Sequence, residues 1–237
     1  MAAEGWEAPG GAGGNVVSVL SHPETGKRYA MVVSSYDVPK DQPVRVVFGP
    51  HITGLKEVLN GKAVATEAAG LFRGATRTLA PSTAELLECA VDADNVPKVY
   101  ADDLSTEKFK TDAVEVRNVK RHPDWSNILS AGDSGATAEQ AYVVYDVDKL
   151  LGPLPAGGAR AVTYEGNGAP PEYRGAFWST SADGKTYAKL SANEFGRPVP
   201  FTARYLKVGL SWRQAEAPHY GALARFSLAQ WKRAAAR

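Results

Sequence analysis

The chain has one cysteine among its 237 residues. Cys89 therefore has no partner for an intrachain disulfide, and neither a CxxC motif nor a cysteine-based zinc site is present. Its neighbours, Leu86-Leu87-Glu88-Cys89-Ala90, alternate as in a strand. We expect Cys89 to be a small buried side chain rather than a nucleophile. No apolar run reaches the roughly 18 residues that a bilayer-spanning helix needs, so we expect no membrane span.

The chain also lacks an excess of charge. Lys and Arg total 27, Asp and Glu total 26, and the formal net charge is +1. Nucleic-acid binding depends on clustered cations that displace counterions, so we expect no nucleic-acid partner. The opening MAAEGWEAPGGAGGN lacks the basic and apolar regions of a signal peptide. Its Gly, Pro and Ala content is typical of a flexible tail or linker, which we assign to residues 1–14.

Motifs of known catalytic loops are scarce. There is no G-x-S-x-G elbow, no G-x-G-x-x-G and no P-loop. Gly132-Asp133-Ser134-Gly135 resembles a serine-protease nucleophile loop, but the matching His and Asp contexts are missing. A glycosidase holds two carboxylates across a cleft, usually on a large barrel, for which a chain of two sandwiches leaves no room. We expect a non-catalytic chain.

Many segments alternate apolar and polar residues, which is the period of two that is typical of half-buried strands. Val44, Val46 and Phe48 share one face of residues 43–48. In residues 203–210, Leu206, Val208 and Leu210 share one face, and Tyr205 and Lys207 share the other. Asn60-Gly61 between apolar runs is a strong hairpin signal. Only the tail LAQWKRAAAR has helical spacing, so the sequence predicts an all-β fold.

A polar passage over residues 91–112 separates two groups of strands. Five or six short strands before it predict a small antiparallel β-sandwich over residues 15–91. Strand-like segments after it predict a larger antiparallel sandwich over residues 92–237; they are 113–119, 140–147, 159–166, 175–181, 185–190, 203–210 and 222–228. We therefore expect two tandem β-sandwiches.

Each half resembles a known family. Residues 15–91, through PVRVVF, GLKEVLNGKAV and RTLAPSTAELLECA, resemble the small β-sandwich that ends many glycoside hydrolases. The second half, through AYVVYDV, STSADGKTYAKL and PVPFTARYLKVGL, is similar to the discoidin-like, galactose-binding-like jelly roll. In its STSADGKTYAKL hairpin, Asp183-Gly184 provides the positive φ of a tight turn. The calcium-binding segment of that family has no clear counterpart, so we expect no cofactor and leave a structural calcium ion open.

The two resemblances imply a non-catalytic carbohydrate-binding or accessory region. Its partners would be a polysaccharide or glycan and an attached or separate glycoside hydrolase, which it would target to that substrate. An extracellular or periplasmic parent protein is implied. Two alternatives stay open. One is a purely structural β-sandwich tail that buttresses a catalytic domain, and the other is a jelly-roll enzyme that degrades polysaccharide.

Sugar binding calls for an exposed aromatic ring and a few planar hydrogen-bonding groups. Loops within residues 120–127, 165–178 and 211–221 contain such mixtures. The candidate ligand-binding residues in these loops are Trp125, Glu172, Tyr173, Arg174, Trp212, Arg213, His219 and Tyr220. Of the other tryptophans, we expect Trp178 to lie in the core and Trp6 and Trp231 to be packing or tail residues.

Overall fold

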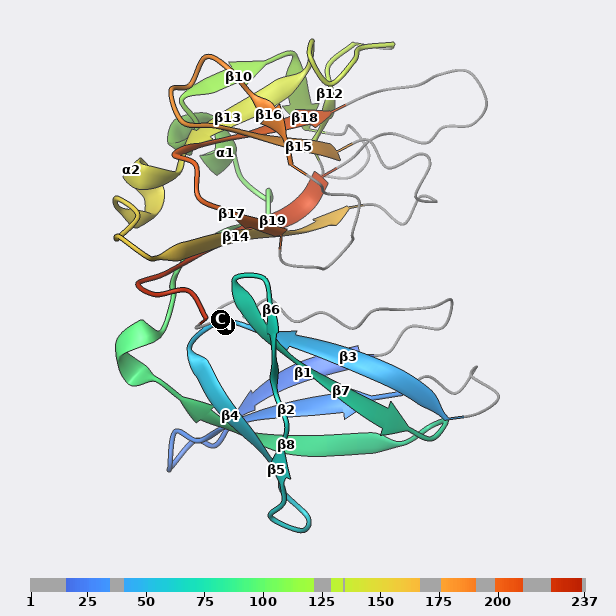
Figure 1. Ribbon diagram of the computed structural model, residues 1–237. Helices are drawn as coiled ribbons and strands as arrows, with labels where there is room; N and C mark the ends of the chain where they lie inside the picture. The colour runs from blue at the N-terminus through green and yellow to red at the C-terminus, as the bar shows by residue number, and fades with distance from the viewer. Residues whose placement is uncertain are drawn as a thin grey trace. The chain divides into compact units, whose positions relative to one another are not determined.

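The computed structural model describes residues 16–34, 41–121, 129–133, 135–166, 176–190, 199–210 and 223–235. These residues form two compact units (Figure 1). The N-terminal unit extends to Pro97 and also contains residues 156–158 and the chain from Trp231 onward. The C-terminal unit contains residues 98–155 and 159–230. The division at Pro97 lies six residues beyond the end of the first sandwich as the sequence predicts it, at residue 91.

The described part of the N-terminal unit consists of two antiparallel sheets. One has the strand order β1-β2-β8-β4-β5 and the other β3-β7-β6. Their bounds are β1 Val16–Ser21, β2 Arg28–Val33, β3 Gln42–Phe48, β4 Ile52–Glu57, β5 Ala63–Val64, β6 Glu67–Ala69, β7 Phe72–Leu79 and β8 Ala84–Val91. A short 3-10 helix, Ala93–Asn95, follows β8.

The core of this unit lies between its two sheets. Val44, Val46 and Phe48 of β3 are fully buried, as their alternation predicts, and they cluster with Ala30 and Val32 of β2 and with other residues from both sheets. Cys89 is also buried there, in agreement with the sequence prediction. Gly61, in the turn between β4 and β5, has φ 73°, which a residue without a Cβ adopts at little cost.

The part of the C-terminal unit that the structure describes forms two further antiparallel sheets. We call the sheet of order β10-β13-β18-β15-β16 the β18 sheet, and that of order β11-β12-β19-β14-β17, to which β9 adds, the β19 sheet. The bounds are β9 Lys98–Asp102, α1 Lys108–Asp112, β10 Glu115–Arg117, β11 Val119–Arg121, β12 Leu129–Ala131, β13 Tyr142–Asp146, α2 Val147–Leu151, β14 Ala159–Gly166, β15 Ala176–Ser181, β16 Ala188–Lys189, β17 Val199–Phe201, β18 Tyr205–Leu210 and β19 Leu223–Trp231.

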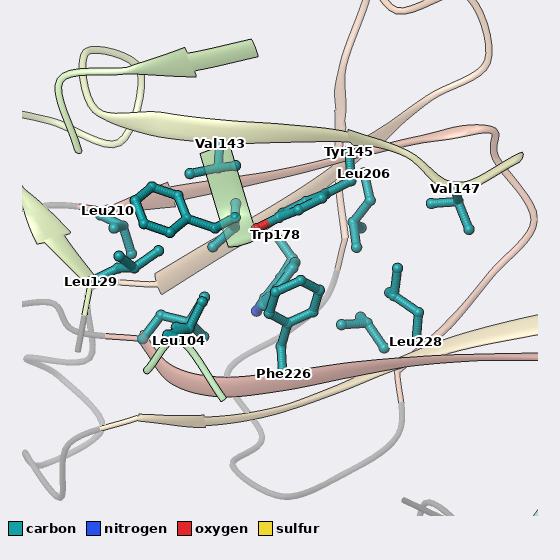
Figure 2. Packing of buried hydrophobic residues seen from close by; sticks show 14 of the residues in the cluster. Leu104, Leu129, Val143, Tyr145, Val147, Trp178, Leu206, Leu210, Phe226 and Leu228 are labelled. Atoms are coloured by element: carbon teal, nitrogen blue, oxygen red, sulfur yellow. The ribbon is translucent and has the colours of Figure 1, made fainter. Parts of the chain in front are cut away.

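Aromatic side chains fill the centre of the C-terminal unit. Figure 2 shows Tyr145, Trp178 and Phe226 meeting between the two sheets. The centroid of the Phe226 ring lies 5.0 Å from that of Tyr145 and 6.0 Å from that of Trp178. Burial of such large side chains removes much apolar surface from water and stabilises the sandwich. The prediction that Trp178 packs in the core is confirmed, and so is the all-β fold built from antiparallel sheets.

The tail contains no helix as far as Ala235, the last residue described, so the helical expectation for it is wrong. β19 runs through Trp231, and the cross-strand pairing Gln230↔Lys98 keeps the preceding residues in the sheet. Beyond Gln230 the chain belongs to the N-terminal unit, where residues 231–235 form what we call the tail segment. The Trp231 indole N–H donates to His51 Nδ1 at 3.0 Å, and the Phe72 ring meets the indole edge-on at 5.7 Å.

Candidate functional site

All eight ligand-binding candidates from the sequence lie outside the described residues. They are Trp125, Glu172, Tyr173, Arg174, Trp212, Arg213, His219 and Tyr220. The structure does describe the strand ends that these loops join. Ala176, where β15 starts, pairs with Leu210, where β18 ends. Leu129 of β12 likewise pairs with Leu223 of β19. The loop residues stay a prediction.

The outer face of the β18 sheet carries several aromatic side chains among the described residues. Val143, Leu206, Val208 and Trp178 point into the core, so their neighbours along each strand point outward. Eight of the outward side chains form what we call the tyrosine face; they are Glu115, Arg117, Tyr142, Ser179, Tyr187, Lys189, Tyr205 and Lys207.

Cross-strand pairing brings these residues together from five strands and from the connection between β15 and β16. Lys207 of β18 pairs with Ser179 of β15, and Ser179 in turn pairs with Lys189 of β16. On β13, Tyr142 pairs with Arg117 of β10. Paired residues share a face and lie near enough to touch. The face is therefore continuous from β10 to β16.

Lys207 lies at the centre of the tyrosine face. Its Nζ is 4.9 Å from the centroid of the Tyr142 ring and 4.7 Å from that of Tyr187. The Tyr142 hydroxyl donates to Glu115 Oε1 at 2.6 Å, which fixes the orientation of that ring. Arg117 approaches the same ring at 6.0 Å. The result is a ring–cation–ring arrangement with a carboxylate at its border.

The hairpin around Asp183-Gly184 positions the remaining rings. Asp183 Oδ1 accepts from the backbone N–H groups of Thr186 (3.0 Å) and Lys185 (2.9 Å) and from Ser181 Oγ (2.8 Å). These hydrogen bonds, led by the one from Thr186, lower the pKa of Asp183 to about 2. Gly184 has φ 74°, and a Cβ there would lie 3.3 Å from the Tyr205 ring. The predicted hairpin and the positive φ at Gly184 are confirmed, but the connection is longer than a tight turn, because β15 ends at Ser181 and β16 begins at Ala188. The connection packs on Tyr205.

The rings of the tyrosine face are accessible in part. Tyr142, Tyr187 and Tyr205 are each half-buried. Partial burial, followed by the negative charge of Glu115, raises the pKa of Tyr187, so its phenol stays neutral at physiological pH. Near Gly209 the face is covered, because a Cβ on Gly209 would lie 2.5 Å from the backbone oxygen of Ala138. The accessible part is thus centred on Lys207.

A second polar cluster, around Arg160, has a structural role. Arg160 is 1% exposed, and it donates from Nε to Gln230 Oε1 at 2.6 Å and from Nη1 to the Ala203 carbonyl at 3.0 Å. Its Nη2 donates to Asp148 Oδ1 and to the Gly152 carbonyl. These bonds engage all three nitrogens of the guanidinium and four of its five N–H groups, so the side chain is held by the protein. The cluster attaches α2 to β14 and β19.

Among the described residues no group of three or more His, Cys, Asp or Glu side chains is placed to hold a metal ion. No described helix is long and apolar enough to cross a bilayer. No family model matches the chain, and no curated protein matches it. The structure alone shows the fold class, which is all-β and built from antiparallel sheets.

Proposed function

We propose that the C-terminal unit binds carbohydrate without catalysing a reaction on it, and that the tyrosine face is the surface it uses. The observation that supports this proposal is the placement of two tyrosine rings, Tyr142 and Tyr187, beside Lys207 on the outside of a sheet, with Tyr205 two residues before Lys207 on the same face of β18. Rings held on a rigid sheet lose little conformational entropy when a ligand binds.

The chemistry of a sugar matches such a surface. One face of a pyranose ring is a plate of C–H groups, and hydroxyls surround it. The tyrosine rings would pack against the plate, since each aromatic contact contributes about 0.5–1.5 kcal/mol beyond its buried area. Glu115 would accept hydrogen bonds from hydroxyls, and Ser179 would both donate and accept. A few such contacts give weak binding, which repeated units of a polysaccharide strengthen by multivalency.

The targeting role is the second part of the proposal. A weak binder that is joined to a hydrolase, or associated with one, raises the concentration of substrate near the catalytic site. The resemblance of residues 15–91 to the sandwich at the end of glycoside hydrolases supports such a partner. The resemblance of the second half to the galactose-binding-like jelly roll supports the sugar-binding part.

Affinity electrophoresis and isothermal titration calorimetry of the full chain against a panel of polysaccharides test the proposal. We expect binding to at least one polysaccharide. The double variant Tyr142→Ala/Tyr187→Ala should weaken it about tenfold or more, because two ring contacts are lost. Tyr29→Ala, on β2 of the N-terminal unit, is the matched control and should leave binding unchanged.

Circular dichroism melting of each variant verifies that the fold persists. No binding to any polysaccharide in the panel would refute the carbohydrate proposal. Binding that survives in the double variant would refute the tyrosine face as its site. The loop variants Trp125→Ala and Trp212→Ala are then the informative comparison, because loss of binding there would assign the site to the sequence-predicted loops instead.

A further inference from the structure

We infer that the saccharide bound at the tyrosine face is anionic, with carboxylate or sulfate groups on its sugars. This inference rests on the proposed function, because it specifies the ligand of the same surface. It follows from an imbalance between the cations and the carboxylates of the face. The cations are available to a ligand, whereas most carboxylates around them are already used.

The cations of the face have no carboxylate partner within the described residues. Arg117 and Lys207 lie over tyrosine rings, and neither they nor Lys189 form an ion pair with any carboxylate that the structure describes. Lys207 and Lys189 both pair with Ser179, one on each side of it. Neighbouring strands are about 4.8 Å apart, so the two lysines are based roughly 10 Å apart along one row.

The carboxylates near the face are satisfied by the protein. Asp183 accepts the hydrogen bonds of its own turn. Asp146, 2% exposed, accepts from Arg204 through both oxygens, at 3.1 Å from Nε and 2.7 Å from Nη2. Glu115 accepts from the Tyr142 hydroxyl. Glu115 and the buried, Arg204-paired Asp146, which pairs with Tyr205, are thus both engaged. Arg117, Lys189 and Lys207 on the same face have no carboxylate partner among the described residues, which leaves a net positive surface.

The position of Lys207 distinguishes this surface from an ordinary solvated lysine. Its ammonium lies within 5 Å of two ring centroids, and attraction to the ring quadrupoles restrains it there. A sugar that packs on the Tyr142 or Tyr187 ring would bring its substituents close to this ammonium. A neutral hydroxyl there gains an ordinary hydrogen bond, and a carboxylate or sulfate gains a stronger, charge-assisted one.

The test uses the full chain and two pairs of polymers that share a backbone. Dextran sulfate is compared with dextran, and polygalacturonate with its methyl ester, so that sulfate and carboxylate are probed separately. Binding is measured by isothermal titration calorimetry at two salt concentrations. We expect the charged member of at least one pair to bind more tightly, and added salt to weaken that binding.

Lys207→Gln should weaken binding of the charged polymer about threefold to tenfold, since an exposed charge-assisted contact is lost. The matched control is Lys149→Gln, which removes the same charge from the exposed end of α2. It should leave the affinity unchanged. Polymers of both kinds bound equally would overturn the anionic preference and leave the proposed function standing. An equal loss of affinity in Lys207→Gln and Lys149→Gln would also overturn the anionic preference of the tyrosine face, because it would indicate general charge attraction. No binding to any polysaccharide would refute both proposals.

Discussion

Replacement of Trp231 by alanine should destabilise the N-terminal unit, although Trp231 lies at the far end of the chain. The indole is 1% exposed and meets Phe72 edge-on, and its N–H donates to His51 Nδ1. Loss of a buried tryptophan costs about 3–5 kcal/mol, which includes the cavity it leaves. A domain of this size is stable by about 5–15 kcal/mol, so the change removes a large share of the total.

Hydrogen exchange followed by mass spectrometry measures this loss in each unit separately, which a single melting curve of a two-unit chain does not. We expect faster exchange in peptides of β3, β4 and β7 and unchanged exchange in β13, β15 and β18. Trp231→Phe keeps most of the apolar area but removes the N–H, so it should cost less, about 1–3 kcal/mol. Lys232→Ala, which is exposed, is the control. Faster exchange confined to residues 98–230 would refute the reasoning.

Three other perturbations each test one buried contact. Burial lowers the pKa of His51 to about 4, so the unfolded chain takes up a proton before the folded chain does as the pH falls. The stability of the N-terminal unit should therefore fall by about 3 kcal/mol between pH 6.5 and pH 4. In His51→Gln, the urea midpoint of unfolding should depend less on pH between about 6.5 and 5. Arg160→Met should destabilise the C-terminal unit by about 3–5 kcal/mol in urea titrations, because it leaves buried acceptors without their donor; a loss below about 1 kcal/mol would contradict this. Gly209→Ala should cost about 1–3 kcal/mol in thermal unfolding, since its Cβ meets the Ala138 oxygen, whereas Gly54→Ala should cost less because its nearest contact is 3.7 Å.

Strands with strong alternation could be predicted from the sequence, and strands without it could not. Leu206, Val208 and Leu210 are all fully buried, as their spacing predicts. β12 was missed because its residues Leu129–Ala131 are all buried, and two of the three are small. β9 was missed because it lies in a polar segment of the sequence and buries the carboxyl group of Asp102. Alternation of apolar and polar residues indicates a strand only where one face of the sheet is exposed to solvent and the other is buried.

The tyrosine face could be predicted only in part. The outward position of Tyr205 and Lys207 is visible in the sequence, because they alternate with apolar residues. Their proximity to Tyr142 and Glu115 is not visible, since it depends on the register of strands that are about 60 to 90 residues apart in the chain. Loop composition directed the sequence prediction to exposed aromatics in loops. The sheet register instead gathers half-buried rings on a flat surface.

The course of the tail determines how the binding proposal has to be tested. Trp231 ends a strand of the C-terminal unit, but its indole is buried in the N-terminal unit beside His51. Arg233 continues this attachment through an ion pair with Asp92 at 2.6 Å, and its backbone N–H donates to Asn95 Oδ1. A fragment that starts at residue 98 would lack these partners and expose an indole at its end. Sugars pack on exposed indoles, so that fragment would gain an aromatic site that the intact chain does not have. Binding by the intact chain is therefore the measurement that bears on the tyrosine face.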